Sequence, residues 1–168
     1  MNVEVKGFEP QHAEQVIATF RTVYGDDYPV DMVYDPAYWI RDNAGAALYT
    51  YVALAEDGRL AGLVSFYQVA PFSGLYESGQ LAVGPEFRKG GTGMQLAREA
   101  SRLFALEPAA AAAFCEMGCH WTVSQSISHQ MGYRDVSFEV GLFPSQTYAK
   151  EHDVAGRVSA IIAYQNFR

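Results

Sequence analysis

Two spacings of hydrophobic residues alternate along the chain, and together they predict an order of strands and helices. Between Pro10 and Tyr24, apolar residues recur every three to four positions, which is typical of an amphipathic helix. Between Leu48 and Ala55, side chains alternate at period two, and the Asp57-Gly58 pair that follows is a strong hairpin signal. The same reasoning predicts strands over residues 3–7, 48–55, 60–69, 75–83, 112–117, 133–143 and 157–164. It predicts helices over residues 10–24, 36–43, 94–104, 123–131 and 146–152.

The alternation of strands and helices indicates an α/β domain. No repeat, linker or low-complexity tract divides the chain, so we expect residues 1–168 to form a single domain. Because the last predicted strand lies almost at the end of the sequence, we keep open that this domain is one part of a longer protein.

Composition and charge restrict the classes of partner. Apolar residues make up 49% of the chain and charged residues 18%, which is enough apolar material to fill a core. The formal charge is −7, from 19 acidic residues against 12 Lys and Arg, and such a surface repels a phosphate backbone. We therefore expect no nucleic-acid partner. No apolar run approaches the roughly 20 residues of a membrane helix, and the N-terminus lacks the apolar region of a signal peptide, so we expect a cytoplasmic protein without a membrane partner.

The two cysteines favour neither a disulfide framework nor a metal site. Cys115, Cys119 and His120 offer three ligands within six residues, and no second cluster accompanies them. We interpret the cysteines as reduced thiols near the end of a strand, and we predict no bound metal.

A glycine-rich turn between a predicted strand and a helix carries the strongest chemical signal. Residues 90–93 contain three glycines, which let the backbone approach a ligand closely, and Arg88 and Lys89 precede them. The unpaired amides and the dipole of a helix N-terminus make such a turn an anion site, suited to a pyrophosphate. A Walker A loop is excluded because Lys89 precedes Gly90, and the dinucleotide fingerprint fails because Gln95 and Leu96 follow the glycines.

The segment 81–94, LAVGPEFRKGGTGM, resembles the acyl-CoA-binding signature of the GNAT superfamily of N-acetyltransferases, with Arg88, Gly91 and Gly93 at its three fixed positions. Residues 124–133 resemble the family's second helix motif, which ends in Gly-Phe or Gly-Tyr. The resemblance implies the GNAT fold, with a mixed, mostly antiparallel sheet of six to seven strands flanked by helices. It also implies that acetyl-CoA is the cosubstrate, with its pyrophosphate on the loop amides and its pantetheine arm along the preceding strand. The cofactor-binding residues that follow from it are Leu81, Ala82, Val83, Arg88, Lys89, Gly90, Gly91, Thr92, Gly93 and Met94.

Acetyl transfer to an amine needs a base, because an ammonium has no lone pair, and it benefits from an acid at the leaving thiolate. Glu77 lies 11 residues before the loop arginine, an offset at which some GNAT enzymes carry their base. Many members carry a Tyr as the acid four positions before the glycine that ends the second helix motif. Ser128 occupies that position here. Ser128 and His129 are therefore our candidates for the acid, and Tyr133 and His120 are further substitutes by position.

The acceptor is less defined by the sequence. In the GNAT fold the segment between the first two helices borders the acceptor, and residues 24–31 carry three aspartates and two tyrosines here. These groups suit a cationic amine, although an ordinary solvated turn has the same composition. Tyr49, Tyr51, Tyr67 and Trp39 are suited equally to an acceptor pocket and to a core, so we leave them unassigned.

Two functions remain open. The first is an N-acetyltransferase that moves an acetyl group from acetyl-CoA to a primary amine of a small molecule or peptide. The second is a regulatory domain that binds acyl-CoA without catalysis, which the missing tyrosine favours. A homodimer is compatible with either function.

Overall fold

The computed structural model describes residues 2–26, 28–148 and 155–168. Seven strands and four α-helices follow the expected order within these ranges. The strands are β1 (Val3–Gly7), β2 (Leu48–Ala55), β3 (Leu60–Tyr67), β4 (Leu75–Val83), β5 (Ala112–Gly118), β6 (Arg134–Phe143) and β7 (Val158–Asn166). The α-helices are α1 (Ala13–Tyr24), α2 (Pro36–Asn43), α3 (Thr92–Phe104) and α4 (Thr122–Gln130).

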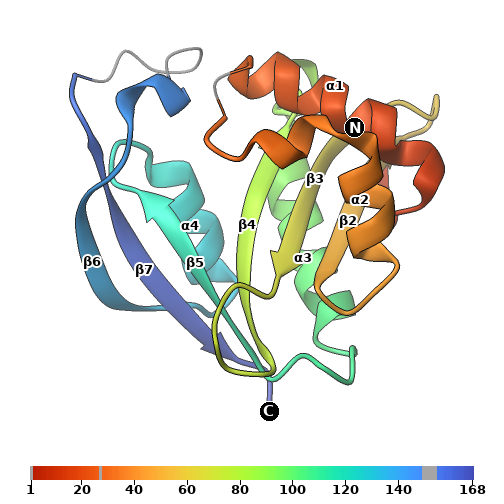
Figure 1. Ribbon diagram of the computed structural model, residues 1–168. Helices are drawn as coiled ribbons and strands as arrows, with labels where there is room; N and C mark the ends of the chain where they lie inside the picture. Colours follow the sequence, from red (N-terminus) through yellow and green to blue (C-terminus); the bar gives the residue numbers. More distant parts are fainter. Residues whose placement is uncertain (1, 27, 149–154) are drawn as a thin grey trace.

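The strands form one mixed sheet in the order β1-β2-β3-β4-β5-β7-β6. All neighbouring pairs are antiparallel except β4 and β5, which run parallel. That parallel pairing covers only three residue pairs, from Leu75 opposite Ala112 to Glu77 opposite Phe114. Beyond Glu77 the two strands diverge, so the sheet splits into a V (Figure 1).

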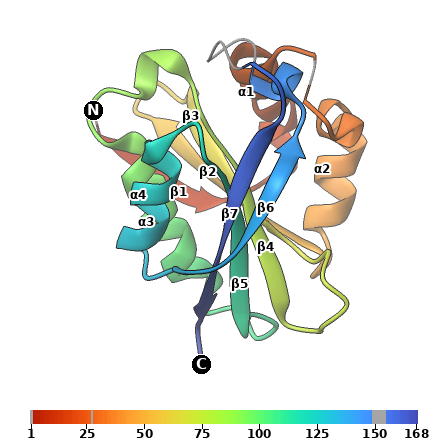
Figure 2. The ribbon, with the colours of Figure 1, turned by 90° about the vertical axis from the view of Figure 1, so that its left-hand side faces the viewer.

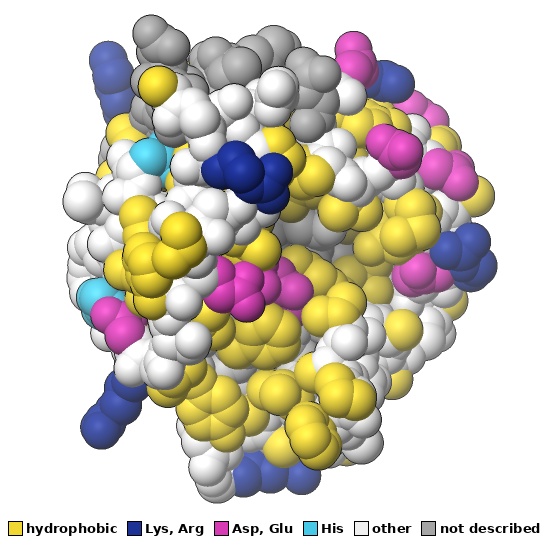
Figure 3. Space-filling view, turned by 60° about the vertical axis from the view of Figure 1, so that its left-hand side comes forward, with side chains coloured by type: hydrophobic (Ala, Val, Ile, Leu, Met, Phe, Trp, Pro, Cys, Tyr) yellow, Lys and Arg dark blue, Asp and Glu magenta, His cyan; other side chains and the backbone are white. Residues whose placement is uncertain are grey.

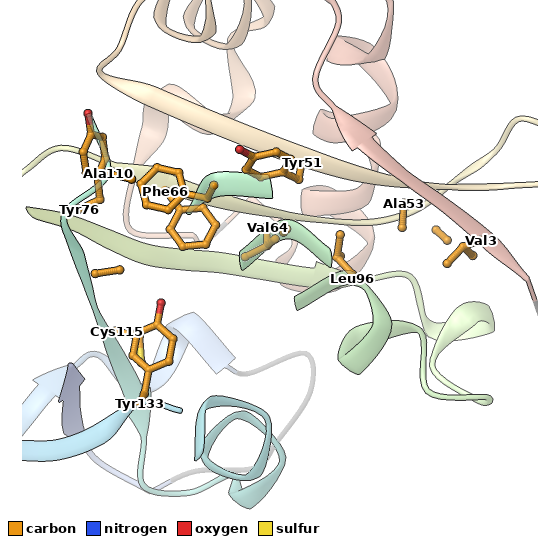
Figure 4. Packing of buried hydrophobic residues seen from close by; sticks show 14 of the residues in the cluster. Val3, Tyr51, Ala53, Val64, Phe66, Tyr76, Leu96, Ala110, Cys115 and Tyr133 are labelled. Atoms are coloured by element: carbon orange, nitrogen blue, oxygen red, sulfur yellow. The ribbon is translucent and has the colours of Figure 1, made fainter. Parts of the chain in front are cut away.

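Helices cover both faces of the first four strands. Figure 2 shows α3 and α4 on one face of the sheet and α1 and α2 on the other. On the α3 face the buried cluster includes Phe66, Tyr76 and Phe104, of which Phe66 and Phe104 stack with ring centroids 4.0 Å apart. Figure 4 shows part of this cluster. On the other face, Phe20 of α1 and Trp39 of α2 pack against β2 and β3. Because both faces are covered, β2 and β3 are almost wholly apolar.

A β-bulge interrupts β4 next to the V. Ser65 pairs with Gly79 and Leu63 with Ala82, so one residue of β3 opposes two residues of β4. Gln80, inside the bulge, has φ +58°, an uncommon backbone conformation for a residue with a side chain. The glycine at 79, noted in the sequence as an interruption of the strand, lets another residue approach. A Cβ there would lie 2.6 Å from the hydroxyl of Tyr67.

Several element ends differ from the sequence prediction. Strand β3 ends at Tyr67 rather than at residue 69, because the chain turns and exposes Val69. Strand β7 continues past residue 164 to Asn166, where it pairs with the start of β5. The first predicted helix begins as a 3₁₀ turn, Pro10–His12. Of the helix predicted over 146–152, the described part is a 3₁₀ turn at Ser145–Tyr148, and residues 149–152 lie outside the described residues. None of the helices in the described ranges is long and apolar enough to span a membrane.

Candidate active site

The divergence of β4 from β5 creates the candidate site. Within the described part of the chain, the β4 residues after Glu77 pair only with β3, so the other edge of the strand is open. Figure 3 shows this side of the molecule, with acidic side chains gathered beside a hollow and surrounded by hydrophobic side chains. The glycine loop lies at the far end of the same strand, at the start of α3.

The loop has the features of an anion site. Gly91 is the N-cap of α3 in the left-handed conformation, with φ +82°, and Gly90 also has a positive φ. The first intrahelical bond runs from the amide of Gln95 to the carbonyl of Gly91, so the amides of residues 92–94 precede the helical ladder. The Thr92 hydroxyl is buried and has no hydrogen-bond partner among the described residues. A ligand oxygen would satisfy this group and the free amides together.

The other predicted cofactor residues surround this helix end. A Cβ on Gly93 would lie 3.7 Å from both Val83 of β4 and Ile127 of α4, so Gly93 leaves room between the two elements. Arg88 is exposed, and its Nε donates a 3.0 Å hydrogen bond to the carbonyl of Val83, which closes the loop. The structure therefore brings the loop and the open edge of Leu81–Val83 together, and this arrangement fits a CoA whose phosphates lie on the loop.

Glu77 lies at the vertex of the V, in the last pair that joins β4 to β5. Its carboxylate accepts a 2.5 Å hydrogen bond from the hydroxyl of Tyr67. The lack of a side chain at Gly79 makes room for that hydroxyl. Burial raises the pKa of Glu77, while the Tyr67 hydrogen bond lowers it in part. A carboxylate with a raised pKa is a better base than an ordinary glutamate, so the position and environment of Glu77 suit proton removal.

Two further carboxylates accompany Glu77. Glu116 lies two residues after Phe114, the partner of Glu77, so both glutamates share one face of the sheet. Glu139 lies on β6, which is separated from β5 by β7, and the strand registers put it on the same face of the sheet. Burial, followed by the charges of Glu77 and Glu139, raises the pKa of Glu116 to about 7. The sequence analysis did not single out Glu116 or Glu139. If β4 and β5 had been expected to pair in parallel, the period-two alternation of β5 would have predicted Glu116 on the same face as Glu77.

The two predicted acids, Ser128 and His129, each have a polar side-chain partner. Ser128 is buried under α4, where its Oγ lies 3.2 Å from the Sγ of Cys115. His129 is exposed, and its Nε2 lies 2.8 Å from the Oδ1 of Asp135 on the surface. Their role as acids stays a prediction. Tyr133, in contrast, is buried, with 5% of its surface exposed, and its ring belongs to the cluster that contains Cys115.

The segment predicted to border the acceptor approaches the site through its tyrosine. Tyr28 contributes to the electrostatic environment of Tyr67, so the segment lies near Glu77. Asp26 is exposed and lies 3.3 Å from Arg21, and Asp27 lies outside the described residues. Of the aromatic residues left unassigned, Tyr49, Tyr51 and Trp39 belong to the packed clusters on either face, and Tyr67 contacts the candidate base.

Other features of the structure do not compete with this site. A surface depression of about 460 Å³ on the β1 side of α3 is lined by Val5, Gln95, Arg98 and Glu99 and by the loop residues Gly91 and Met94, so it adjoins the predicted cofactor loop. Cys115 is a buried thiol whose pKa burial raises to about 11, and Cys119 is an exposed thiol. No group of three or more His, Cys, Asp or Glu side chains in the described ranges is arranged to hold a metal ion.

Comparison with known proteins agrees with this geometry. The model of the Acetyltransferase (GNAT) family matches residues 13–120 of this chain. The chain therefore belongs to this family. A GNAT acetyltransferase from Streptococcus pneumoniae has a similar structure, with a TM-score of 0.80, 12% identity and coverage of 98% of this chain and 99% of the other. The resemblance that the glycine loop carried, and the mixed sheet it implied, are thereby confirmed.

Two other solved structures share the fold at low identity. A spermidine N-acetyltransferase from Vibrio cholerae has a TM-score of 0.73 at 13% identity, covering 98% of this chain and 94% of its own. The ribosomal-protein-S18-alanine N-acetyltransferase of Escherichia coli has a TM-score of 0.70 at 14% identity, covering 99% and 94%. The sequence has no significant match among curated proteins.

Proposed function

We propose that this protein is an N-acetyltransferase that moves an acetyl group from acetyl-CoA to a cationic primary amine. The observation that carries the proposal is the position of Glu77 relative to the glycine loop. Glu77 lies on β4, and the glycine loop follows the end of that strand. The two therefore lie at opposite ends of the strand edge that β5 leaves open. The six residue-to-residue steps from Glu77 to Val83 span roughly 20 Å at about 3.3 Å per step. A donor whose phosphates lie on the loop and whose thioester reaches Glu77 must therefore extend along this edge.

In this reaction Glu77 removes a proton from the acceptor amine. The ammonium form of the acceptor has no lone pair, so the proton must leave before or during attack on the thioester. The raised pKa of Glu77 makes its carboxylate more basic, and the hydrogen bond from Tyr67 fixes one of its oxygens. The second oxygen then receives the proton, either directly or through a water molecule.

The face that surrounds Glu77 supports a cationic acceptor. Glu116 and Glu139 place two more carboxyl groups on the same side of the sheet, and each attracts an ammonium group through Coulomb interaction. An acidic acceptor would be repelled by the same groups. The solved structures with this fold include N-acetyltransferases named for spermidine and for an alanine of ribosomal protein S18, so both are named for the acetylation of nitrogen.

Thiol release from acetyl-CoA in the presence of different amines would test the proposal. We expect turnover with cationic small molecules or peptides and none with amines that carry an adjacent carboxylate. Glu77→Gln should lower kcat by roughly 10²- to 10⁴-fold, the usual value of a positioned base, and leave CoA affinity unchanged in calorimetry. A Glu77→Gln enzyme with wild-type turnover at every pH would remove Glu77 from the mechanism.

A second function has one observation in its favour. Ser128 stands where the family's tyrosine acid is expected, and its hydroxyl faces Cys115. A domain that binds acyl-CoA without catalysis would show this loss. Tight CoA binding, together with no thiol release across the whole amine panel, would favour that function over the enzyme.

A further inference from the structure

A row of four side chains, which we call the cross-strand row, crosses the sheet from the candidate base to the edge strand β6. Glu77 pairs with Phe114 of β5, and Phe114 pairs in turn with Tyr164 of β7. Tyr164 then pairs with Arg134 of β6. Residues directly opposite each other in neighbouring strands point to the same face, so the four side chains form one line. Three strand spacings of about 4.8 Å put the ends of this line, Glu77 and Arg134, roughly 14 Å apart.

The cross-strand row lies on an accessible part of the sheet. Cys115 belongs to the cluster on the α3 face, so its neighbour Phe114 points to the opposite face. On that face α1 and α2 pack against β2 and β3, and Figure 1 shows both helices away from β6 and β7. Arg134 and Tyr164 are exposed, and Phe114 is half-buried. A ligand that contacts Glu77 can therefore continue over the two aromatic rings toward β6.

The two ends of the row carry opposite charges. Glu77 and the carboxylates that surround it lie at one end, and the guanidinium of Arg134 lies at the other. Arg134 forms no ion pair within the described ranges, and the adjacent Asp135 pairs with His129 instead. Figure 3 shows hydrophobic side chains next to the acidic ones on this side of the molecule. The face is thus acidic at the base, apolar in the middle and basic at the edge of the sheet.

On the basis of the proposed function, we propose that the cross-strand row binds the body of the acceptor, an amine joined through an apolar or aromatic segment to a carboxylate about 14 Å away. The amine contacts Glu77, the apolar segment packs on Phe114 and Tyr164, and the carboxylate pairs with Arg134. Aromatic rings bind apolar groups over their faces, and a guanidinium matches a carboxylate in charge and geometry. A peptide of four extended residues has these dimensions, since each residue spans about 3.4 Å.

The distance between the two charges of the acceptor is essential to this proposal. A carboxylate next to the amine would lie among the glutamates and be repelled by them. At about 14 Å the repulsion from Glu77 is largely screened, because the Debye length is about 8 Å at physiological ionic strength. The attraction to Arg134 then decides where the anionic end of the acceptor lies.

Matched tetrapeptides test the role of Arg134. For a peptide with two central phenylalanines, the free C-terminal acid should have a kcat/KM about two- to fivefold above that of the amide, through KM, as expected for an exposed ion pair. The preference should weaken in high salt and disappear in Arg134→Gln. Arg134→Glu should reverse it. The acid-like KM should return with a tetrapeptide amide whose fourth residue is glutamate, because Arg134 recognises the carboxylate rather than the chain end.

Arg102→Gln is the matched control for charge. Arg102 is an exposed arginine of α3 that pairs with Glu99 at 2.6 Å, and its loss should leave the preference for the acid unchanged. CoA affinity in calorimetry should be the same in all of these proteins, because none of the changes lies at the glycine loop.

A second pair of variants tests the aromatic part of the row. In the wild type, replacing the two central phenylalanines of the peptide by glycines should lower kcat/KM roughly tenfold. In Tyr164→Ser this difference should shrink to about threefold or less, because Phe114 remains. Leu106→Ser, at an apolar residue that is 71% exposed beyond α3, should keep the full difference.

The outcomes separate this proposal from the acetyltransferase function. Equal kcat/KM for the acid and the amide in the wild type, with turnover of both, would overturn the proposal and leave the function intact. A wild-type dimer in light scattering that Tyr164→Ser dissociates would show that a second copy covers the row, and it would also overturn the proposal. No thiol release with any amine or peptide would overturn both.

Discussion

Replacement of Glu116 by glutamine isolates the electrostatic cost of the acidic face. Burial and the charges of Glu77 and Glu139 raise the pKa of Glu116 from 4.5 to about 7. A carboxyl group with a raised pKa favours the folded state below its unfolded pKa, and this contribution is lost as the pH rises through the folded pKa. Wild-type protein should therefore lose stability between about pH 4.5 and pH 7 through this group, and Glu116→Gln should not.

The size of the effect follows from that difference in pKa. At about 1.4 kcal/mol per pH unit, the interval corresponds to an upper limit of roughly 3 kcal/mol. Since Glu116 is only partly buried, solvent screening reduces this value, and we expect Glu116→Gln to be more stable than wild type by roughly 1–2 kcal/mol above pH 8. The two proteins should be equally stable near pH 4.

Urea unfolding at several pH values would measure this difference. Glu56→Gln, in the exposed turn between β2 and β3, is the matched control and should change the free energy of unfolding by less than about 0.5 kcal/mol at any pH. The same Glu116→Gln protein should show a higher KM for a cationic acceptor. The raised pKa of Glu116 would be refuted by a stability difference that does not depend on pH. It would also be refuted if Glu116→Gln were less stable than wild type above pH 8.

Three further predictions concern the neighbouring groups. Tyr67→Phe removes the hydrogen bond that lowers the pKa of Glu77, so the acidic limb of the plot of kcat/KM against pH should move to higher pH. If this limb does not move, Glu77 is not the group that titrates. Gly93→Val places its methyl groups between Val83 and Ile127, so CoA affinity in calorimetry should fall by at least about 100-fold, whereas Gly45→Ala, in open space, should bind normally. Ser128→Ala breaks the contact with Cys115, so the free energy of unfolding measured in urea should fall by about 1 kcal/mol. Turnover should stay within twofold of wild type, and a large loss of turnover would support Ser128 as the acid.

The sequence predicted the fold well because the signals that define it are local. The helical spacing after Pro10 and the alternation after Leu48 each depend on neighbouring residues, and the glycine turn identifies the end of β4. The strand ends at Tyr67 and Asn166 were missed because they depend on a turn and on pairing with a distant strand. Such long-range pairing leaves no periodic trace in the sequence.

The candidate site was predictable only where a motif carried it. The glycine loop and Glu77 lie at fixed offsets along β4, so the sequence alone was sufficient to single them out. Glu116 and Glu139 come from β5 and β6, and their proximity to Glu77 depends on the parallel junction and on the insertion of β7 between these strands.

The three-pair junction between β4 and β5 also affects how the molecule holds together. Strands β1 to β4 have packed helices on both faces, whereas β5 to β7 join them through few backbone hydrogen bonds and through the cluster on the α3 face. A ligand extended along the open edge of β4 would add main-chain contacts that β5 does not make. Cofactor binding would then slow amide hydrogen exchange in β5 and β7, strands that lie outside the glycine loop, because the two halves of the sheet would open together less often.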